Sequence, residues 1–399
     1  MSFESLGLDP SFLSTLAQLG YAEPTQVQRS AIPSVIAGGD LLVSSQTGSG
    51  KTAAFILPAL QRLQQAAARP GAGPRVLVLA PTRELALQVQ KATHGYAAGQ
   101  KLRTACLVGG MPFGVQLKQL GKAVDLVVAT PGRLKDHMNR GSVSLARVEL
   151  LVLDEADRML DMGFQEDIDA IVAQVPAERQ TLLFSATLDG VVGKLARRVT
   201  RNPNRIAVDS SEIKGAITQH ALFADNEAHK SRLLDTLLRD TEIDQAIVFT
   251  ATKRGAETLH QSLAAQGFAC GALHGDMQQR QRSWTLQRLR DRRMRVLVAT
   301  DVAARGIDVP GINLVVNYDA PRQSGDYVHR IGRTGRAGRA GVAVTMLGRG
   351  ERHLVRSIER ETGNAMSVMV IPGLEPKPGQ AQPTPTTARF ARGRGRHRA

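Results

Sequence analysis

The stretch "LLVSSQTGSGKTAAF", from Leu41 to Phe55, decides the fold of this chain. It starts as a short apolar run, passes through a turn rich in glycine and small polar residues, and continues into a helical pattern. Glycines at such a turn let backbone N–H groups approach phosphate oxygens, and the start of the helix adds a positive dipole. The order of strand, glycine-rich turn and helix therefore predicts a phosphate-binding loop at the carboxyl end of a buried strand.

The residue types within the loop fit a nucleotide and its metal ion. Lys51 can reach the β- and γ-phosphates, and the hydroxyl of Thr52 can ligate Mg²⁺. The strict phosphate-loop pattern has a glycine where this chain has Ser45, which is small and can still make a tight turn. We predict nucleotide binding by the whole segment, namely Ser45, Gln46, Thr47, Gly48, Ser49, Gly50, Lys51 and Thr52.

Outward from this loop, short runs of Val, Ile and Leu alternate with longer segments of helical periodicity. Runs that are apolar on both faces and separated by helices are typical of parallel strands in a doubly wound α/β sheet. Small or polar residues follow nearly every run, and open α/β sheets bind ligands at that carboxyl edge. The predicted strands include residues 40–44, 75–81, 125–131, 150–157 and 181–187 in the first half, and 245–252, 295–301, 312–319 and 341–347 in the second.

The length of 399 residues is too great for one ordinary core and predicts two domains. The polar segment "DSSEIKGAI" predicts a linker at 209–217, which leaves a first domain at 1–208 and a second at 218–372. The tail 373–399 is dominated at first by Pro, Gly, Thr and Gln, and we predict that it is disordered. Its arginines can hold RNA electrostatically, although a merely solubilising tail is the alternative. They are Arg389, Arg392, Arg394, Arg396 and Arg398.

The composition points to a polyanionic partner in a reducing compartment. The net charge of +15 and the pI near 10.4 favour nucleic acid over a membrane surface, with a merely basic protein as the alternative. Two cysteines, Cys106 and Cys270, cannot form a disulfide framework and fit a cytoplasmic protein. The first ten residues do not resemble a secretory signal, and no apolar run approaches the roughly 18 residues of a membrane span.

A second stretch, "VLDEADRML" from Val152 to Leu160, sets three carboxylates after an apolar run. On its own it could be the acidic start of a helix, which the helix dipole favours. A phosphate loop, however, requires an acid on a partner strand to hold Mg²⁺. We therefore predict that Asp154 holds the metal together with Thr52, and that Glu155 orients and deprotonates the attacking water.

The remaining motifs carry a family resemblance. In chain order, "GYAEPTQVQ", "SQTGSGKT", "PTREL", "TPGR", "DEAD", "SAT", "HGDM", "ATDVAARGIDV" and "HRIGRTGR" resemble the motif series of the DEAD-box ATP-dependent RNA helicases. The resemblance covers about residues 1–372, and "VIPGLEPKPG" is similar to the bacterial RhlE-type subgroup. It implies two tandem RecA-like domains that bind ATP and Mg²⁺ in their cleft and single-stranded RNA across both top faces.

In the first domain, the resemblance implies that Gln28 reads the adenine edge and that Phe3 covers the adenine ring, although simple packing of Phe3 is the alternative. The motifs after three successive predicted strands offer N–H groups, hydroxyls and arginines, which suit RNA phosphates. Taken singly, each of these motifs could be an ordinary helix cap or turn. The implied RNA contacts are Pro81, Thr82, Arg83, Gly109, Gly110, Thr130, Gly132 and Arg133.

In the second domain, the resemblance implies that Arg333 and Arg336 reach across the cleft to the γ-phosphate as arginine fingers. Guanidinium suits this role because it stays charged and forms bidentate bonds, while a solvated basic helix face is the alternative. The resemblance further places Asp308 near a ribose hydroxyl, and Thr300 and Arg305 near RNA.

The motif "SAT" is implied to couple the nucleotide site to the RNA side through Ser185 and Thr187. Asp157 and His329 are its expected partners. The alternatives are a strand-to-helix cap for "SAT" and a structural interface histidine for His329.

The resulting hypothesis is an RNA-stimulated ATPase and helicase in which ATP and RNA close the cleft and hydrolysis reopens it. Binding energy would then assemble the catalytic site, as in induced fit. A non-catalytic RNA annealing or binding module and a DNA translocase are the two alternatives. We expect a monomer with RNA as its partner, and ribosomal or RNA-decay proteins as further partners; the sequence leaves the RNA substrate and the process open.

Overall fold

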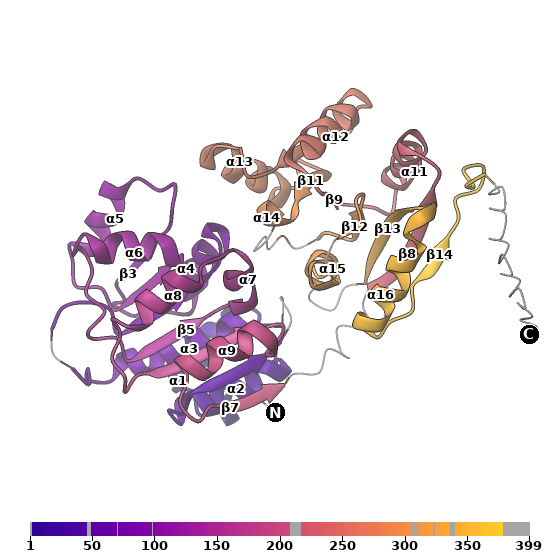
Figure 1. Ribbon diagram of the computed structural model, residues 1–399. Helices are drawn as coiled ribbons and strands as arrows, with labels where there is room; N and C mark the ends of the chain where they lie inside the picture. Colours follow the sequence, from indigo (N-terminus) through magenta and orange to yellow (C-terminus); the bar gives the residue numbers. More distant parts are fainter. Residues whose placement is uncertain are drawn as a thin grey trace, which may run out of the picture.

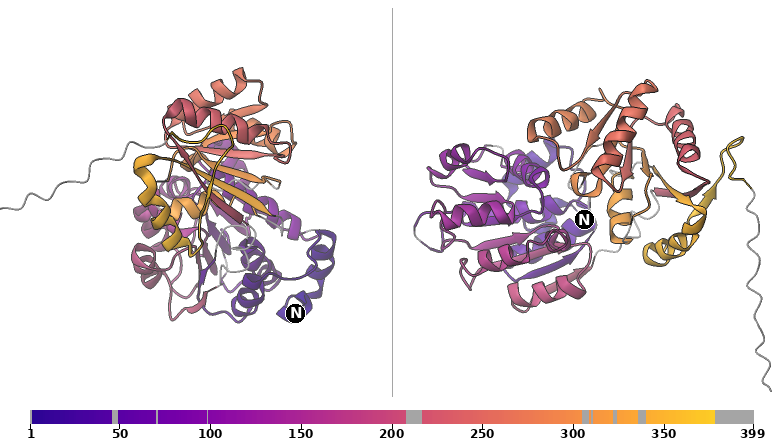
Figure 2. Two further views of the ribbon diagram at one scale, coloured as in Figure 1. Left: turned by 90° about the vertical axis from the view of Figure 1, so that its right-hand side faces the viewer. Right: turned by 45° about the horizontal axis from the view of Figure 1, so that its top comes forward.

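The computed structural model describes residues 2–45, 49–69, 71–97, 99–207, 217–304, 309, 311–321, 324–335 and 340–377. Two α/β units follow one another along the chain, and the views agree that each is a sheet covered by helices (Figures 1 and 2). None of the helices within these ranges is long and apolar enough to cross a membrane.

The first unit is built on a parallel sheet with the strand order β3-β4-β2-β5-β6-β1-β7. Successive residues of a strand enter different cores: Leu41 and Val43 pack on one face of the sheet and Leu42 on the other. Both faces are therefore buried, which is why the strands are continuous apolar runs. The strands are β1 (Leu41–Ser44), β2 (Val76–Leu79), β3 (Thr104–Leu107), β4 (Leu126–Ala129), β5 (Leu150–Leu153), β6 (Gln180–Ser185) and β7 (Asn204–Ala207).

The second unit repeats this plan with the parallel strand order β10-β11-β9-β12-β13-β8-β14. Its central strands are likewise buried on both faces, with Val248 in one core and Ile247 in the other. The strands are β8 (Ile217–Ala224), β9 (Ala246–Thr250), β10 (Cys270–Leu273), β11 (Val296–Thr300), β12 (Leu314–Asn317), β13 (Gly341–Gly348) and β14 (Ser367–Met369).

Helices cover the sheets, and capping residues in the sequence define where several of them begin. Thr25 caps α2 in a reciprocal capping box with Gln28, and Asn226 and Thr252 cap α11 and α12 through their side chains. The helices of the first unit are η1 (Phe3–Leu6), α1 (Pro10–Gln18), α2 (Gln26–Ile36), α3 (Lys51–Gln64), α4 (Arg83–Tyr96), α5 (Phe113–Leu120), α6 (Pro131–Asn139), α7 (Ala156–Asp161), α8 (Gln165–Val172) and α9 (Gly190–Val199). Those of the second are α11 (Glu227–Arg239), α12 (Lys253–Ala265), α13 (Gln279–Arg290), α14 (Asp301–Ala304), α15 (Ser324–Ile331), η2 (Arg349–Glu351) and α16 (Arg352–Thr362).

The predicted fold class, two tandem units with parallel sheets, is confirmed. Strands β3, β8, β10 and β14 correspond to none of the predicted runs, and β8 begins at Ile217, the last residue assigned to the linker. The rest of the linker, at 209–216, and the end of the tail, including its five arginines, lie outside the described residues.

The strand order divides the carboxyl edge of the first sheet into two halves. Strand β6, which ends in "SAT", lies between β1, which leads into the phosphate loop, and β5, which leads into "DEAD". On the other half, β2, β4 and β3 lead into the three motifs that we expect to hold RNA. Neighbouring parallel strands end at the same edge, so each group of motifs is brought together by the sheet.

Candidate active site

The phosphate loop is anchored by the start of α2. The Nε2 of Gln28 donates to the carbonyl oxygen of Gly50 at 3.1 Å, and the hydroxyl of Thr25 donates to that of Ser49 at 2.8 Å. Gly50 adopts a left-handed conformation with φ of 89°, and a Cβ there would lie 2.5 Å from the Gln28 amide. A glycine is therefore required at this position both by its conformation and by the approach of Gln28.

Two residues expected around the adenine have packing roles in this structure. Gln28 is fully buried, and its Oε1 accepts from the backbone N–H of Thr25 at 2.9 Å. Its amide can still make further hydrogen bonds, so adenine recognition stays a prediction. Phe3 is 6% exposed and meets the ring of Tyr21 edge-on at 6.2 Å, which favours the packing alternative. Its contact with adenine also stays a prediction.

Lys51 and Asp154 face the loop from α3 and from the end of β5. The Nζ of Lys51 is buried and donates to the carbonyl oxygen of Ser45 at 3.2 Å. Burial raises the pKa of the Asp154 carboxyl, the positive charge of Lys51 opposes this rise, and the carboxylate of Glu155 adds to it. Within the described residues, Oδ1 of Asp154 is buried without a hydrogen-bond partner. This oxygen is thus available to a cation.

The donor set fits Mg²⁺ better than a metal that needs a complete protein cage. No group of three or more His, Cys, Asp or Glu side chains in the described ranges could hold a metal ion. The protein would supply the Asp154 carboxylate and the hydroxyl of Thr52, at the first turn of α3. Mg²⁺ is commonly held by one or two carboxylates together with substrate phosphates and water, so these residues fit that ion.

Glu155 has an unusual backbone and a buried partner. Its φ of 54° and ψ of 53° are left-handed, which costs a non-glycine residue about 1–2 kcal/mol. It precedes α7, but its side chain makes no capping bond; Oε2 instead accepts from Nη1 of Arg158 at 2.7 Å. Arg158 is fully buried. Strained residues of this kind cluster at active sites, and the sequence alone did not single out Arg158.

The third carboxylate of the stretch, Asp157, points to "SAT". Its Oδ2 accepts from the backbone N–H of Ala186 at 2.9 Å, while the backbone N–H of Ser45 donates to the carbonyl oxygen of Ser185 at 3.0 Å. The "SAT" segment therefore contacts both the phosphate loop and α7. The next helix, α9, is preceded by Asp189, so "SAT" is not a helix cap. Coupling through Ser185 and Thr187 stays a prediction.

The residues expected to bind RNA gather at the ends of β2, β3 and β4. The guanidinium of Arg83 lies so close to the backbone of Gly109 and Gly110 that a Cβ on Gly110 would overlap it. Arg133 donates from Nη1 to the carbonyl oxygen of Met111 at 3.1 Å. Arginines and glycine backbone thus form one continuous surface.

The polar residues of the same motifs differ in what they do. The hydroxyl of Thr82 accepts from the backbone N–H of Leu85 at 3.2 Å and so caps α4, whereas Thr130 makes no such bond at α6. Pro81 follows β2 and Gly132 lies in the first turn of α6. Their RNA contacts stay predictions.

In the second unit, an ion pair joins two motifs. Arg330 of "HRIGRTGR" is buried and donates to both carboxylate oxygens of Asp301, at 2.6 and 2.8 Å. It also donates to the side-chain oxygen of Asn317 at 3.2 Å. Bidentate arginine–carboxylate pairs are rigid. Arg330 therefore fixes α15, which carries His329, against α14 and the end of β11, where Thr300 is buried.

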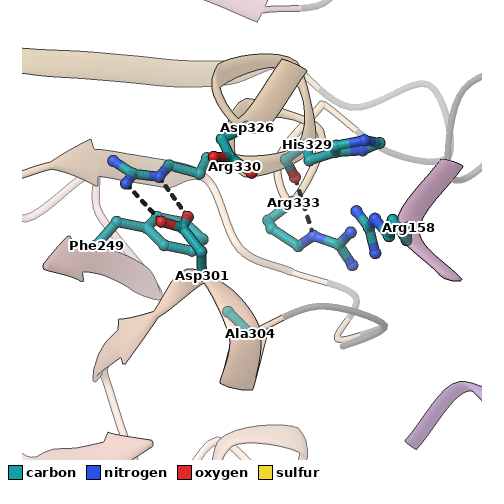
Figure 3. Close-up of a pocket in the computed structure, with 8 residues that line it drawn as sticks. All are labelled: Arg158, Phe249, Asp301, Ala304, Asp326, His329, Arg330 and Arg333. Carbon is teal, nitrogen blue, oxygen red and sulfur yellow. Dashed lines mark hydrogen bonds and ion pairs between the residues drawn. The ribbon is translucent and has the colours of Figure 1, made fainter. Parts of the chain in front are cut away.

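A small pocket brings the two units together (Figure 3). Arg158 of the first unit lines it with His329 and Arg333 of the second, and the Nε of Arg333 donates to the carbonyl oxygen of His329 at 3.2 Å. In Figure 3 the guanidinium groups of Arg158 and Arg333 face each other. Arg158 is paired with Glu155, so this pocket places Arg333 beside the residue that holds the expected general base. Six predicted site residues, Gln46, Thr47, Gly48, Arg305, Asp308 and Arg336, lie outside the described residues.

The two units also meet at the RNA half of the edge. Arg282 of α13 donates to the Glu84 carboxylate at 2.8 and 3.0 Å, with side chains 12% and 8% exposed. Beside this pair, Nη1 of Arg83 donates to the side-chain oxygen of Gln279 at 3.1 Å. Sequence reasoning missed Glu84, Gln279 and Arg282, because nothing in their spacing indicates a contact across nearly two hundred positions.

We expect the ion pair between Glu84 and Arg282 to stabilise the closed arrangement of the two units. Reversing one charge, in Glu84→Arg or in Arg282→Glu, should lower RNA-stimulated ATPase about five- to a hundred-fold, because coupling between sites is typically worth 1–3 kcal/mol. ATPase without RNA should stay unchanged. The double variant, with the charges exchanged, should recover activity in a steady-state assay; additive losses would show that the pair does not couple the units.

Two parallel sheets in tandem, with a phosphate loop after β1, define a protein of the tandem RecA-like class. The model of the DEAD/DEAH box helicase family matches residues 25–195, and that of the helicase conserved C-terminal domain matches residues 229–338. The ATP-dependent RNA helicase DeaD of Escherichia coli (strain K12) is 44% identical over 375 residues, which are 94% of this chain and 59% of DeaD.

Two further proteins match over most of their own length. The DEAD-box ATP-dependent RNA helicase 20 of Oryza sativa is 41% identical over 98% of this chain and 80% of the plant protein. A structure of S. cerevisiae Dbp5 bound to RNA and ADP BeF3 superposes with a TM-score of 0.83 and 33% identity, covering 92% of this chain and 95% of the Dbp5 chain in that structure. The chain belongs to the DEAD/DEAH box helicase family.

Proposed function

We propose that this protein is an ATP-dependent RNA helicase that separates RNA duplexes locally or remodels RNA–protein complexes. ATP and single-stranded RNA together hold the two domains closed, and ATP hydrolysis to ADP and phosphate releases them. The protein spans 59% of the length of DeaD, so the activity of that longer relative is carried over as a proposal for this chain.

One observation carries this proposal: the first sheet places the nucleotide motifs on β1, β6 and β5 and the expected RNA motifs on β2, β4 and β3. The second unit contacts both halves of this edge. Its Arg333 lines a pocket with Arg158 on the nucleotide half, and its Arg282 forms an ion pair with Glu84 on the RNA half. A domain that contacts both sites can couple their occupancy. The similarity to Dbp5 bound to RNA and ADP BeF3 supports the same interpretation.

The proposed chemistry uses residues from both domains. Glu155 takes a proton from the water that attacks the γ-phosphate, and its bond to Arg158 fixes the carboxylate. Lys51 contacts the β- and γ-phosphates, and Arg333 with Arg336 stabilises the charge that develops on the transferred group. Mg²⁺, when held by Thr52 and Asp154, would neutralise phosphate charge.

RNA would be held by its phosphates, so the protein would act on many sequences. We further propose that the protein is cytoplasmic, which rests on its cysteine content, and that it is a monomer. We also propose membership of the RhlE-type subgroup, which rests on "VIPGLEPKPG" from Val370 to Gly379. Ribosomal or RNA-decay proteins are proposed partners.

The test compares RNA-stimulated phosphate release by the wild type and by Lys51→Ala. We expect a loss of at least about a hundred-fold, since removing one donor from a charged transition state typically costs that much. Lys194→Ala, on the exposed surface of α9, is the matched control and should keep full activity. Equal rates in wild type and Lys51→Ala would indicate an RNA-binding module, and equal stimulation by matched DNA would indicate a DNA translocase.

A further inference from the structure

Helix α13 presents a face that neither the catalytic nor the RNA residues described above use. Leu286 and Leu289 pack into the core, and Arg282 reaches Glu84 of the first domain. The opposite face carries Trp284, which is 61% exposed and is the only tryptophan of the chain. Tryptophan is usually buried for most of its surface, so this exposure needs an explanation.

Trp284 is flanked by arginines at helical spacing. Residues four positions apart lie on one face of a helix, so Arg280, Trp284 and Arg288 form a row about 12 Å long. The guanidinium of Arg288 lies 4.6 Å from the centre of the indole ring, where it makes a cation–π contact. We call this row the α13 face.

The α13 face begins where the expected RNA surface ends. Gln279, the first residue of α13, accepts from Arg83, and Arg83 packs on Gly109 and Gly110. Figure 1 shows α13 at the side of the second domain nearest to the first. Arg280 follows Gln279 directly, so the α13 face starts one residue from the contact with Arg83.

The charge around the α13 face fits a polyanion. From residue 279 to residue 293, Asp291 is the one acid, and it accepts from Gln287 at 2.7 Å. A protein partner would be expected to need apolar neighbours around the tryptophan, whereas the neighbours that reach the surface here are arginine, glutamine and serine. Nucleic acid meets both features, since its bases stack on aromatic rings and its phosphates pair with arginine. The arginines of this segment are Arg280, Arg282, Arg288, Arg290, Arg292 and Arg293.

We propose that the α13 face is an accessory site for single-stranded RNA that leaves the groove between the two domains. One base stacks on Trp284, and the neighbouring phosphates pair with Arg280 and Arg288. Stacking of this kind is tolerant of sequence. The site increases the length of RNA that the protein holds and does not select its sequence. This proposal rests on the RNA-binding function proposed above.

Because Trp284 is the only tryptophan, its fluorescence reports this site directly in the full chain. Oligouridylates of about 4 to 16 nucleotides, a range that covers single-strand site sizes, would be titrated with a non-hydrolysable ATP analogue. Short RNAs that already stimulate the ATPase should leave the fluorescence unchanged. Longer RNAs should quench it above a threshold length and bind more tightly.

Variants separate the α13 face from the groove. Trp284→Ala should weaken binding of long RNA about five- to a hundred-fold and leave binding of short RNA unchanged, while Trp284→Phe should keep most of the gain. Arg280→Ala with Arg288→Ala should weaken long RNA and flatten its salt dependence. Arg356→Ala with Arg360→Ala, which removes the same amount of charge from exposed positions of α16, should weaken long RNA less.

Two results would overturn the proposal, and they differ in what they leave standing. If RNA stimulates the ATPase but Trp284→Ala binds long RNA as the wild type does, the accessory site is wrong and the helicase function stands. If no RNA of any length stimulates the ATPase or binds, the helicase function and the accessory site both fail.

Discussion

Glu155→Gln is expected to stop turnover while leaving ATP and RNA bound. Glutamine keeps the shape of the side chain but cannot accept the proton of the attacking water, and loss of a general base typically costs 10²–10⁴-fold in rate, here a fall of about a thousand-fold in kcat. The bond to Arg158 survives in weaker form because an amide oxygen can still accept. Labelled RNA should dissociate slowly from the variant when ATP is present.

The matched control for this variant is Glu166→Gln, an exposed acid of α8. It should hydrolyse ATP at the wild-type rate in single-turnover experiments. Normal hydrolysis by Glu155→Gln would show that another group is the base, and rapid release of RNA with ATP bound would contradict the proposed clamp.

Arg333→Lys is expected to reduce kcat about a thousand-fold or more, because an arginine finger contributes 10³–10⁵. Lysine keeps the charge but loses the planar fork that a phosphoryl group requires. Arg333 is buried in the pocket beside Arg158. Water therefore cannot replace the hydrogen bonds that are lost when lysine takes the place of the guanidinium group. ATP binding, measured with a fluorescent analogue, should change little.

Arg356→Lys on the exposed surface of α16 is the control and should be fully active. A variant Arg333→Lys that loses ATP affinity but keeps kcat would assign Arg333 to ground-state binding. One that keeps both would remove it from the catalytic site altogether.

The sequence predicted the strands that are continuous runs of large apolar residues and missed those that are not. Strand β5, "LLVL", is a continuous apolar run and could be read directly. Strand β10, "CGAL", contains glycine and alanine because Gly271 packs against Met294, so its apolar signal is weak. Strand β14 is a three-residue edge with Val368 exposed, and an edge strand carries no pattern of double burial.

The candidate site divides in the same way between local and distant contacts. Motifs whose chemistry lies within a few residues, such as the phosphate loop at Lys51, were readable from the chain itself. The long-range contacts that support these motifs could not be predicted. The hydrogen bond from Gln28 to Gly50 and the ion pair of Glu84 with Arg282 depend on how separate elements pack together. The spacing of residues along one sequence contains no information about such tertiary contacts.

The division of the first sheet into two halves also determines how the effects of two substitutions combine. Within the sheet, the halves join where β2 pairs with β5, from Val76 beside Leu150 to Leu79 beside Leu153. Helices α3 and α4 also pack against each other at this junction. Free-energy effects of substitutions at separated sites usually add, and those of neighbours do not. Paired substitutions, one in each half, should therefore combine additively where neither residue contacts the other half or the second unit. They should combine non-additively at this junction and at Arg158 and Glu84, where the second unit contacts the two halves, so ATP use and RNA use are constrained to change together at these places.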